Sequence, residues 1–407
     1  MKTLHQNAAL DEKASRAADR SRIVEIEAKI WELTRSIHIL QKEADSAQDR
    51  LDAYTYPVLT LPPEIVSEIF VHFIPVYPRR APTNGLGSPL TLAQICRPWR
   101  EIAFSTPRLW RAVHMSVSSK TTLDEQLNLV ESSLARSGSC LLSIQLSSQW
   151  YEDHIPLIDL VAPHCERLQH LKLCVFAFTN FHWDSLQRPL LSLRSLTVAG
   201  TVAIDRLPTV FLSAPLLNKV ALGAYNEYYA DWRSILPWSQ LSVLTVESIG
   251  LDHCALLLAL APKLVFCMFV VISVHIRPNY TPIPPCQFLE TLAFRTKFPM
   301  ELLQGFWERL TLPALRDLQI CEVFLGPDPV EGLRVSLSRS QCGPSRICVL
   351  DGKKPLKQYR KAMPLVVFSK GRQPPSRKPD ELTDIEDLEQ LDWGDAGSED
   401  SDPDNEA

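Results

Sequence analysis

Two short stretches between residues 59 and 110 decide how the N-terminal part of this 407-residue chain folds. The first reads LTLPPEIVSEIF at residues 59–70, and the second reads LTLAQICRPWREIA at residues 90–103, followed by STPRLW at residues 105–110. Proline is tolerated in the first turn of a helix, and Glu64 complements the positive end of the helix dipole. A helix is therefore expected to begin at the LPPE segment, and two further amphipathic segments predict two more short helices.

In this order, the patterns LPxEI, [IV]CxxWRxIA and STPxLW resemble the F-box of large fungal adaptor families of the agaricomycete type. Members of these families dock a substrate receptor onto a ubiquitin ligase. The resemblance covers residues 57–115 and implies an apolar face that binds a Skp-family adaptor and, through it, a cullin. The residues implied to touch the adaptor are Leu61, Pro62, Ile65, Ile69, Leu92, Ile95, Cys96 and Trp99. On the amphipathic pattern alone, a plain three-helix core with Trp99 buried inside is the simpler interpretation, but the ordered combination favours the F-box.

Two features depart from the family pattern. Residues 75–88 contain several prolines and glycines, which predicts a loop inserted between the first two helices. Pro98 falls inside the CxxWR segment, where it breaks a continuous helix but is harmless if the third helix begins there. Neither departure removes an apolar contact residue, but either one is able to weaken docking.

An N-terminal helix is predicted over residues 21–55, after a disordered segment at residues 1–20. Its apolar residues alternate spacings of three and four, as in a heptad seam: Ile23, Ile26, Ile30, Leu33, Ile37, Leu40, Ala44, Ala47 and Leu51. A single helix with one apolar stripe needs a partner. Two alternatives stay open, a coiled-coil homodimer through residues 23–51 and packing of the helix against its own F-box.

Downstream of the F-box an L-x-x-L-x-L pattern recurs with nearly constant spacing. Its matches begin at residues 168, 193, 217, 241, 264, 289 and 315, with an eighth candidate at residue 141. This period predicts an α/β solenoid over residues 120–350, a degenerate leucine-rich-repeat array with a curved parallel sheet. The repeats are degenerate because the usual asparagine position is occupied by other residues.

The strand residues between the apolar ones are expected to face solvent on the concave side of that sheet. In the resembling family this surface, or the loops at its rim, captures the protein substrate. The candidates for target binding are His170, Lys172, Arg194, Thr197, Lys219, Thr245, Glu290, Arg316 and Gln319.

No motif for catalysis is present in the sequence. Phosphate-binding glycine loops, the GxSxG elbow, HExxH and CxxC do not occur. The ten cysteines are scattered without paired spacing, which fits a reducing compartment, the cytoplasm or the nucleus. We therefore expect no enzymatic activity and no bound cofactor. We also expect no membrane span and no nucleic-acid binding.

The net charge of −5 hides a division along the chain. Residues 380–407 contain thirteen Asp or Glu and no Lys or Arg, so they predict an acidic disordered tail. The preceding residues 351–379 are basic and rich in proline and are expected to form a linker. The resemblance to the F-box family implies that the chain is the substrate-recognition subunit of a Skp–cullin–F-box (SCF) ubiquitin ligase. The alternatives are a repeat-based interaction scaffold without ligase docking and a nuclear regulator that uses the basic linker and the acidic tail.

Overall fold

The computed structural model describes residues 2–53, 57–82, 85–117, 123–148, 155–177, 188–201, 209–223, 232–273, 283–296 and 306–372. The chain divides into two compact units, Met1–Val66 and Ser67–Ala407, and each is described by itself. The acidic tail predicted at residues 380–407 lies outside the described residues.

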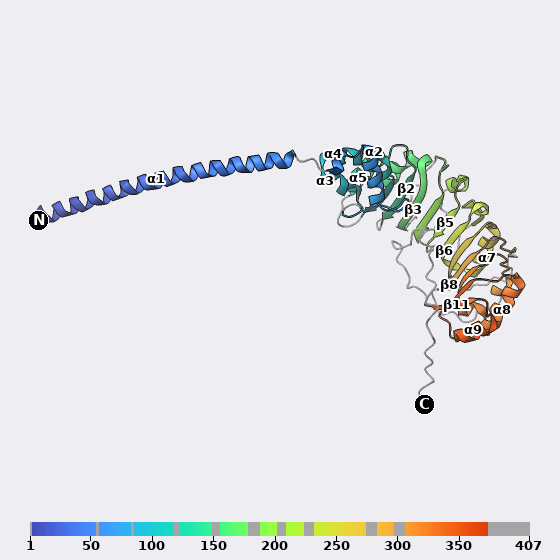
Figure 1. The fold of residues 1–407 in the computed structure, drawn as a ribbon. Coiled ribbons are helices and arrows are strands. Elements are labelled where there is room, and N and C mark those ends of the chain that lie inside the picture. Colours follow the sequence, from blue (N-terminus) through green and yellow to red (C-terminus); the bar gives the residue numbers. More distant parts are fainter. Residues whose placement is uncertain are drawn as a thin grey trace, which may run out of the picture. The chain divides into compact units, whose positions relative to one another are not determined.

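The first unit is dominated by one long helix, α1 (Lys2–Asp52), drawn in blue in Figure 1. It begins near the N-terminus, so the expectation of disorder over residues 1–20 is wrong. Residues 2–20 are rich in alanine, include lysine and arginine, and contain no proline or glycine, which explains why the helix extends through them. The heptad residues from Ile23 to Leu40 keep about half or more of their surface exposed.

Three short helices follow the loop after α1: α2 (Pro63–Phe73), α3 (Pro89–Ile95) and α4 (Arg97–Phe104). The division between the two units falls inside α2. All three helices begin where the sequence predicted. The insertion at residues 75–88 lies between α2 and α3, and in the described residues it contains neither helix nor strand before Pro89.

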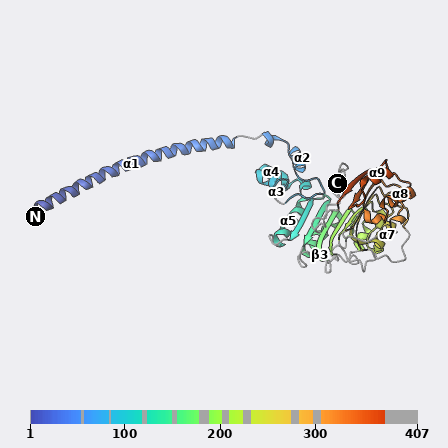
Figure 2. The ribbon, with the colours of Figure 1, turned by 90° about the horizontal axis from the view of Figure 1, so that it is seen from below.

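The second unit is built on one sheet of eleven parallel strands whose spatial order follows the chain order (Figures 1 and 2). The strands are β1 (Ala112–Val117), β2 (Leu142–Ser148), β3 (Leu168–Ala177), β4 (Ser195–Thr201), β5 (Lys219–Leu222), β6 (Val243–Gly250), β7 (Phe266–Ser273), β8 (Thr291–Thr296), β9 (Asp317–Cys321), β10 (Arg346–Leu350) and β11 (Val367–Gly371). Every predicted L-x-x-L-x-L segment contributes its strand. The result is a solenoid-like α/β fold.

One face of the sheet packs against helices and forms the main core. The buried apolar residues of the L-x-x-L-x-L segments share one cluster with side chains from the helices between strands. These helices are α5 (Leu123–Arg136), α6 (Ile155–Val161), α7 (Leu251–Leu260), α8 (Pro329–Ser340) and α9 (Leu356–Ala362). We call this side the helix face. The other side, which we call the opposite face, carries the alternate residues of each strand.

The opposite face has a regular register that runs across all eleven strands. One row of paired residues crosses the whole sheet, and we call it the central row: His114, Gln145, Lys172, Thr197, Ala221, Thr245, Met268, Ala293, Gln319, Cys348 and Ser369. The row beside it contains Ser143, His170, Ser195, Lys219, Val243, Phe266, Thr291, Asp317, Arg346 and Val367. Polar residues gather at the β1–β4 end, whereas the middle strands are mainly apolar.

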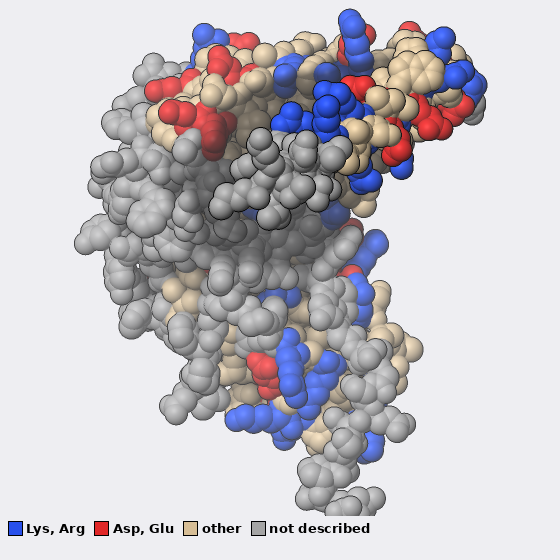
Figure 3. Space-filling view, turned by 90° about the vertical axis from the view of Figure 1, so that its left-hand side faces the viewer, with Lys and Arg blue, Asp and Glu red and all other residues tan. Residues whose placement is uncertain are grey.

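The basic segment at residues 351–379 is not a linker along its first part. It forms α9 and the last strand, β11, which pairs with β10. Leu356 and Tyr359 of α9 and Phe368 of β11 are buried in the main core, so hydrophobic burial outweighs the basic composition. Residues 352–372 carry seven Lys or Arg and no Asp or Glu. Figure 3 shows Lys and Arg gathered in the lower part of the view, at the height of the last strands of the sheet.

Candidate protein-interaction sites

The start of α2 follows from its two prolines. The backbone N–H groups of Ile65 and Val66 donate to the carbonyl of Pro62, at 3.0 and 3.1 Å. The missing N–H of Pro63 costs nothing in a first turn, because that group has no partner within a helix. Leu61, Pro62 and Ile65 are exposed in the first unit. Further along the helix, Ile69 keeps 48 % of its surface exposed although it is a large apolar residue.

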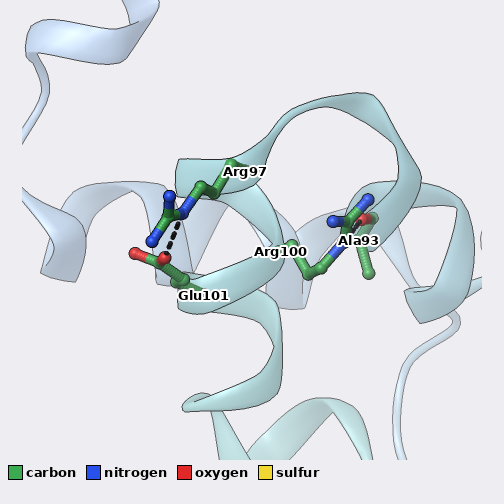
Figure 4. Close-up of polar contacts among 4 residues, drawn as sticks. All are labelled: Ala93, Arg97, Arg100 and Glu101. Carbon is green, nitrogen blue, oxygen red and sulfur yellow. Dashed lines mark hydrogen bonds and ion pairs between the residues drawn. The ribbon is translucent and has the colours of Figure 1, made fainter.

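The second helix is held at both ends. The buried Ser88 caps α3, because its hydroxyl accepts a hydrogen bond from the backbone N–H of Leu90 at 3.2 Å. At the other end, the Arg100 guanidinium donates from Nε to the carbonyl of Ala93 at 2.8 Å and links α4 to α3 (Figure 4). This contact fixes the last turn of α3, where Ile95 has 58 % of its surface exposed.

The third helix accommodates the proline that departs from the family pattern. Cys96 has an extended backbone and α4 begins at Arg97, which places Pro98 in the first turn. Arg97 and Glu101 form an ion pair one turn apart at 3.0 Å (Figure 4). The third helix therefore begins where Pro98 fits without breaking it, and the effect of Pro98 on docking stays a prediction.

Aromatic side chains join these helices to one another and to the sheet. The rings of Phe70 and Trp99 meet edge to face with centroids 5.0 Å apart. Phe70 is buried and Trp99 is partly buried beside it. Trp110 donates from its indole N–H to the carbonyl of Ala103 at 2.8 Å. The guanidinium of Arg136, on α5, lies 4.9 Å from the Trp110 ring centroid. Cation–π contacts of this kind fasten the helical region to the first repeat.

The residues implied to touch a Skp-family adaptor divide into three groups. Leu61, Pro62, Ile65, Ile69 and Ile95 are exposed, Cys96 and Trp99 are partly buried, and Leu92 is buried with 4 % of its surface exposed. Leu92 is thus largely covered within the chain itself, and its expected contact with a partner stays a prediction. It lies three residues before Ile95, on the side of α3 that turns inward beside buried Ala93.

The structure also corrects the predicted target face. Thr197, Thr245 and Gln319 belong to the central row and are buried, with 4 %, 0 % and 1 % of their surface exposed. They flank or lie within a second apolar cluster on the opposite face, formed by Cys174, Ala199, Ala221, Val243, Phe266, Met268 and Ala293. Parallel strands are commonly buried on both faces and then read as continuous apolar runs. The run LVFCMFVVI at residues 264–272 is the signal that alternation alone overlooked.

The remaining target-face candidates are accessible, but they do not form one group. Arg194 and Arg316 are exposed and Glu290 is partly exposed, each directly before a strand. Arg316 and Glu290 form an ion pair at 3.8 Å, so their opposite charges partly cancel before β8 and β9. His170, Lys172 and Lys219 are partly buried at the β3–β5 end of the opposite face.

The inserted loop contributes site residues that no sequence pattern had indicated. Tyr77 packs edge to face on His170 at 5.4 Å between ring centroids, and the Arg111 guanidinium lies 4.0 Å from the Tyr77 centroid. Arg80 of the same loop hydrogen-bonds Nδ1 of His114 on β1. Burial, with the charges of Arg80 and Lys172, lowers the pKa of His114 to about 3. Burial, with the charges of Lys219 and Arg194, lowers the pKa of His170 to about 4.

Three buried thiols have pKa values raised above the ordinary range, the opposite of what an activated nucleophile needs. Burial raises the pKa of Cys165 and Cys286 to about 11 and that of Cys321 to about 12, so these thiols stay protonated and unreactive. In the described part of the chain, no three His, Cys, Asp or Glu side chains come together as metal ligands do. None of the described helices has both the length and the apolar character needed to cross a membrane.

Comparison with known families supports this arrangement. Residues 58–116 match the F-box-like family, which covers α2, α3, α4 and the first strand. The chain therefore contains an F-box-like domain, and proteins with this domain are typically non-catalytic adaptors that bind Skp1-type partners. No curated protein matches the chain.

Proposed function

We propose that the chain is the substrate-recognition subunit of an SCF-type ubiquitin ligase. The observation that carries the proposal is the F-box-like match at residues 58–116, together with the exposure of large apolar residues at the positions implied to touch a Skp adaptor. Isoleucines exposed on short, fixed helices favour a protein partner, because burying them removes apolar surface from water. The cullin is reached through that adaptor.

In this proposal the sheet holds the target. The match to a known family ends at residue 116, where the sheet has only begun, so the remaining repeats are free to serve recognition. We infer that they are degenerate leucine-rich-type repeats of the kind found in fungal F-box proteins. The protein then acts by proximity, because it holds a target near the ligase and raises the effective concentration for ubiquitin transfer by other subunits.

The test is binding of a purified Skp adaptor to the full chain. Wild-type protein should bind, and a Leu61→Ala/Pro62→Ala variant should bind at least tenfold more weakly in calorimetry. A Leu365→Ala variant is the matched control, because Leu365 is 95 % exposed near β11. If folded wild-type protein does not bind the adaptor, the ligase role is wrong and a repeat-based scaffold without docking becomes the better account.

We further propose that α1 forms a parallel two-stranded coiled coil with a second copy. Its seam places isoleucine at residues 23, 30 and 37 and leucine at residues 33 and 40, a distribution that favours parallel dimers. An Ile30→Glu/Ile37→Glu variant should convert a dimer to a monomer in light scattering coupled to size-exclusion chromatography. A monomeric wild-type chain at micromolar concentration refutes the coiled coil.

We infer a cytoplasmic or nuclear location from the cysteines. All ten are free in the structure, which fits a reducing compartment. Imaging of a tagged full chain tests this inference.

A further inference from the structure

A small polar hollow lies on the opposite face at the β1–β4 end of the sheet. Its volume is about 40 Å³, which suits a few water-sized groups rather than a peptide segment. Its lining comes from two parts of the chain far apart in sequence. Pro78 and Arg80 belong to the loop after α2, and most of the rest belongs to strands β2, β3 and β4.

Cations and hydrogen-bond donors dominate the lining. Arg80 and Lys172 supply positive charge, and Ser143, Ser195, Thr197 and Gln145 supply hydroxyl and amide groups. None of the described residues that line the hollow is acidic. A guanidinium offers a planar fork of N–H groups and an ammonium acts as a point charge, which is how proteins hold oxyanions.

Two partly buried histidines, His114 and His170, report on the charges of the described residues around the hollow. Among the described residues, the charged groups that lower the pKa values of His114 and His170 are cations: Arg80 and Lys172 for the first, Lys219 and Arg194 for the second. Both imidazoles are therefore neutral at pH 7. His170 is fixed by a 2.7 Å hydrogen bond between its Nδ1 and the hydroxyl of Ser195.

We propose that this hollow binds a phosphate-sized oxyanion between Arg80, Lys172 and the hydroxyl groups of β2–β4. The ring of cations attracts a dianion, and the small volume selects a compact tetrahedral group. An extended strand of nucleic acid is disfavoured because no stripe of basic and aromatic residues leads away from the hollow in the described residues. The same chemistry fits free phosphate and a phosphate carried by a serine side chain.

The inserted loop thereby gains a role that its sequence did not suggest. Residues 77–80 bring Arg80 onto the sheet, so this site depends on the segment that departs from the F-box pattern. The site belongs to the sheet proposed to hold the target, but anion binding itself does not require the ligase role. Each proposal therefore stands or fails by its own measurement.

The experiment titrates the full chain with inorganic phosphate, and separately with an N-acetyl-phosphoserine amide and its unphosphorylated serine analogue, at constant ionic strength. Calorimetry or phosphorus NMR measures affinity. Arg80→Gln and Lys172→Gln should each weaken phosphate binding by tenfold or more. Arg80→Lys should retain part of it, which separates loss of charge from loss of folding. Lys357→Gln, on α9 at the far end of the sheet, is the matched control and should bind like the wild type.

Each outcome decides the proposal. Binding of phosphate and phosphoserine amide, lost in Arg80→Gln, supports the site and admits a modified protein as its source. Binding of free phosphate alone supports the site but restricts it to the ion. Absence of binding to either probe, or equal loss in Lys357→Gln, overturns the proposal. Adaptor binding measured on the same samples shows separately whether the F-box is functional.

Discussion

The F-box-like helices and the β1–β4 end of the opposite face present two different surfaces. On α2 and α3 the exposed groups are large and apolar, as Ile69 and Ile95 show. On the opposite face the accessible groups are cations, hydroxyls and neutral histidines, while the apolar residues of that face are buried in the middle strands. The two regions are joined by one loop, because Tyr77 and Arg80 follow directly after α2.

This difference separates permanent from conditional binding. Apolar surface gains free energy from burial regardless of modification state or salt, which suits a constant partner. A positive hollow gains free energy only from a ligand that carries the matching anion, which suits selection among targets. If both proposals hold, a general docking surface and a selective surface lie on adjoining segments of one chain.

The largest expected effect comes from charging the apolar surface. An Ile69→Glu/Ile95→Lys variant keeps the net charge and places two ions where the adaptor must exclude water. Adaptor binding should fall at least a thousandfold, or about 4 kcal/mol. Pull-down and calorimetry measure it, with a Leu365→Glu variant as the control. Adaptor binding by the double variant within tenfold of wild type contradicts the assignment of this surface.

A second experiment separates the docking surface from its own core. Leu92→Ala should destabilise the protein by about 3 kcal/mol, because it leaves a cavity beneath α3. Ile95→Ala, three residues away and mostly exposed, should cost less than about 0.5 kcal/mol of stability. Urea denaturation measures both. Adaptor affinity per folded molecule should fall for Ile95→Ala and stay unchanged for Leu92→Ala; the reverse pattern contradicts the burial of Leu92.

The helical region and the strands were largely predictable, since their signals are local. The prolines at residues 62, 63 and 98 mark helix starts, and the L-x-x-L-x-L period fixes which side chains enter the core. β10 was missed because the helix α8 lengthens the spacing before it and breaks the period, and β11 was missed because its sequence VFSKG lacks the L-x-x-L-x-L pattern. The folding of α9 and β11 was missed because the seven basic residues of 352–372 concealed three buried core residues, Leu356 and Tyr359 of α9 and Phe368 of β11.

The site was less predictable, because its residues meet only through the fold. Arg80 lies 34 residues from His114 in sequence, and nothing in an inserted loop rich in proline indicates that it packs on a strand. Burial of Thr197, Thr245 and Gln319 depends on their neighbours in adjacent strands, which the alternation within one strand does not reveal. Gln319 tolerates burial because its amide oxygen accepts a hydrogen bond from Arg295 Nε at 2.7 Å.

A third, smaller effect follows from the neutral histidines. The folded-state pKa values of His114 and His170, about 3 and about 4, lie below the ordinary value of 6.5. The unfolded chain therefore binds more protons, so these groups favour folding above pH 6.5, and stability falls as pH drops from there towards 4. At pH 5 each histidine should cost about 2 kcal/mol relative to pH 7.5. A His114→Gln/His170→Gln variant should lose less stability over this range in urea denaturation, and an equal loss contradicts the prediction.

The smallest expected effect is a difference in salt dependence between phosphate binding at the hollow and adaptor binding at the F-box-like helices. Raising the salt concentration from about 50 to about 300 mM shortens the screening length from roughly 14 to roughly 6 Å, which weakens the attraction of the cations for an anion. Phosphate binding should weaken about threefold. Adaptor binding should change less than about twofold, because contacts between apolar side chains do not depend on charge attraction that salt screens. Calorimetry on one sample series measures both. If adaptor binding were the more salt-sensitive of the two, charge rather than apolar area would dominate at the F-box, and the division between a constant and a selective surface would be wrong.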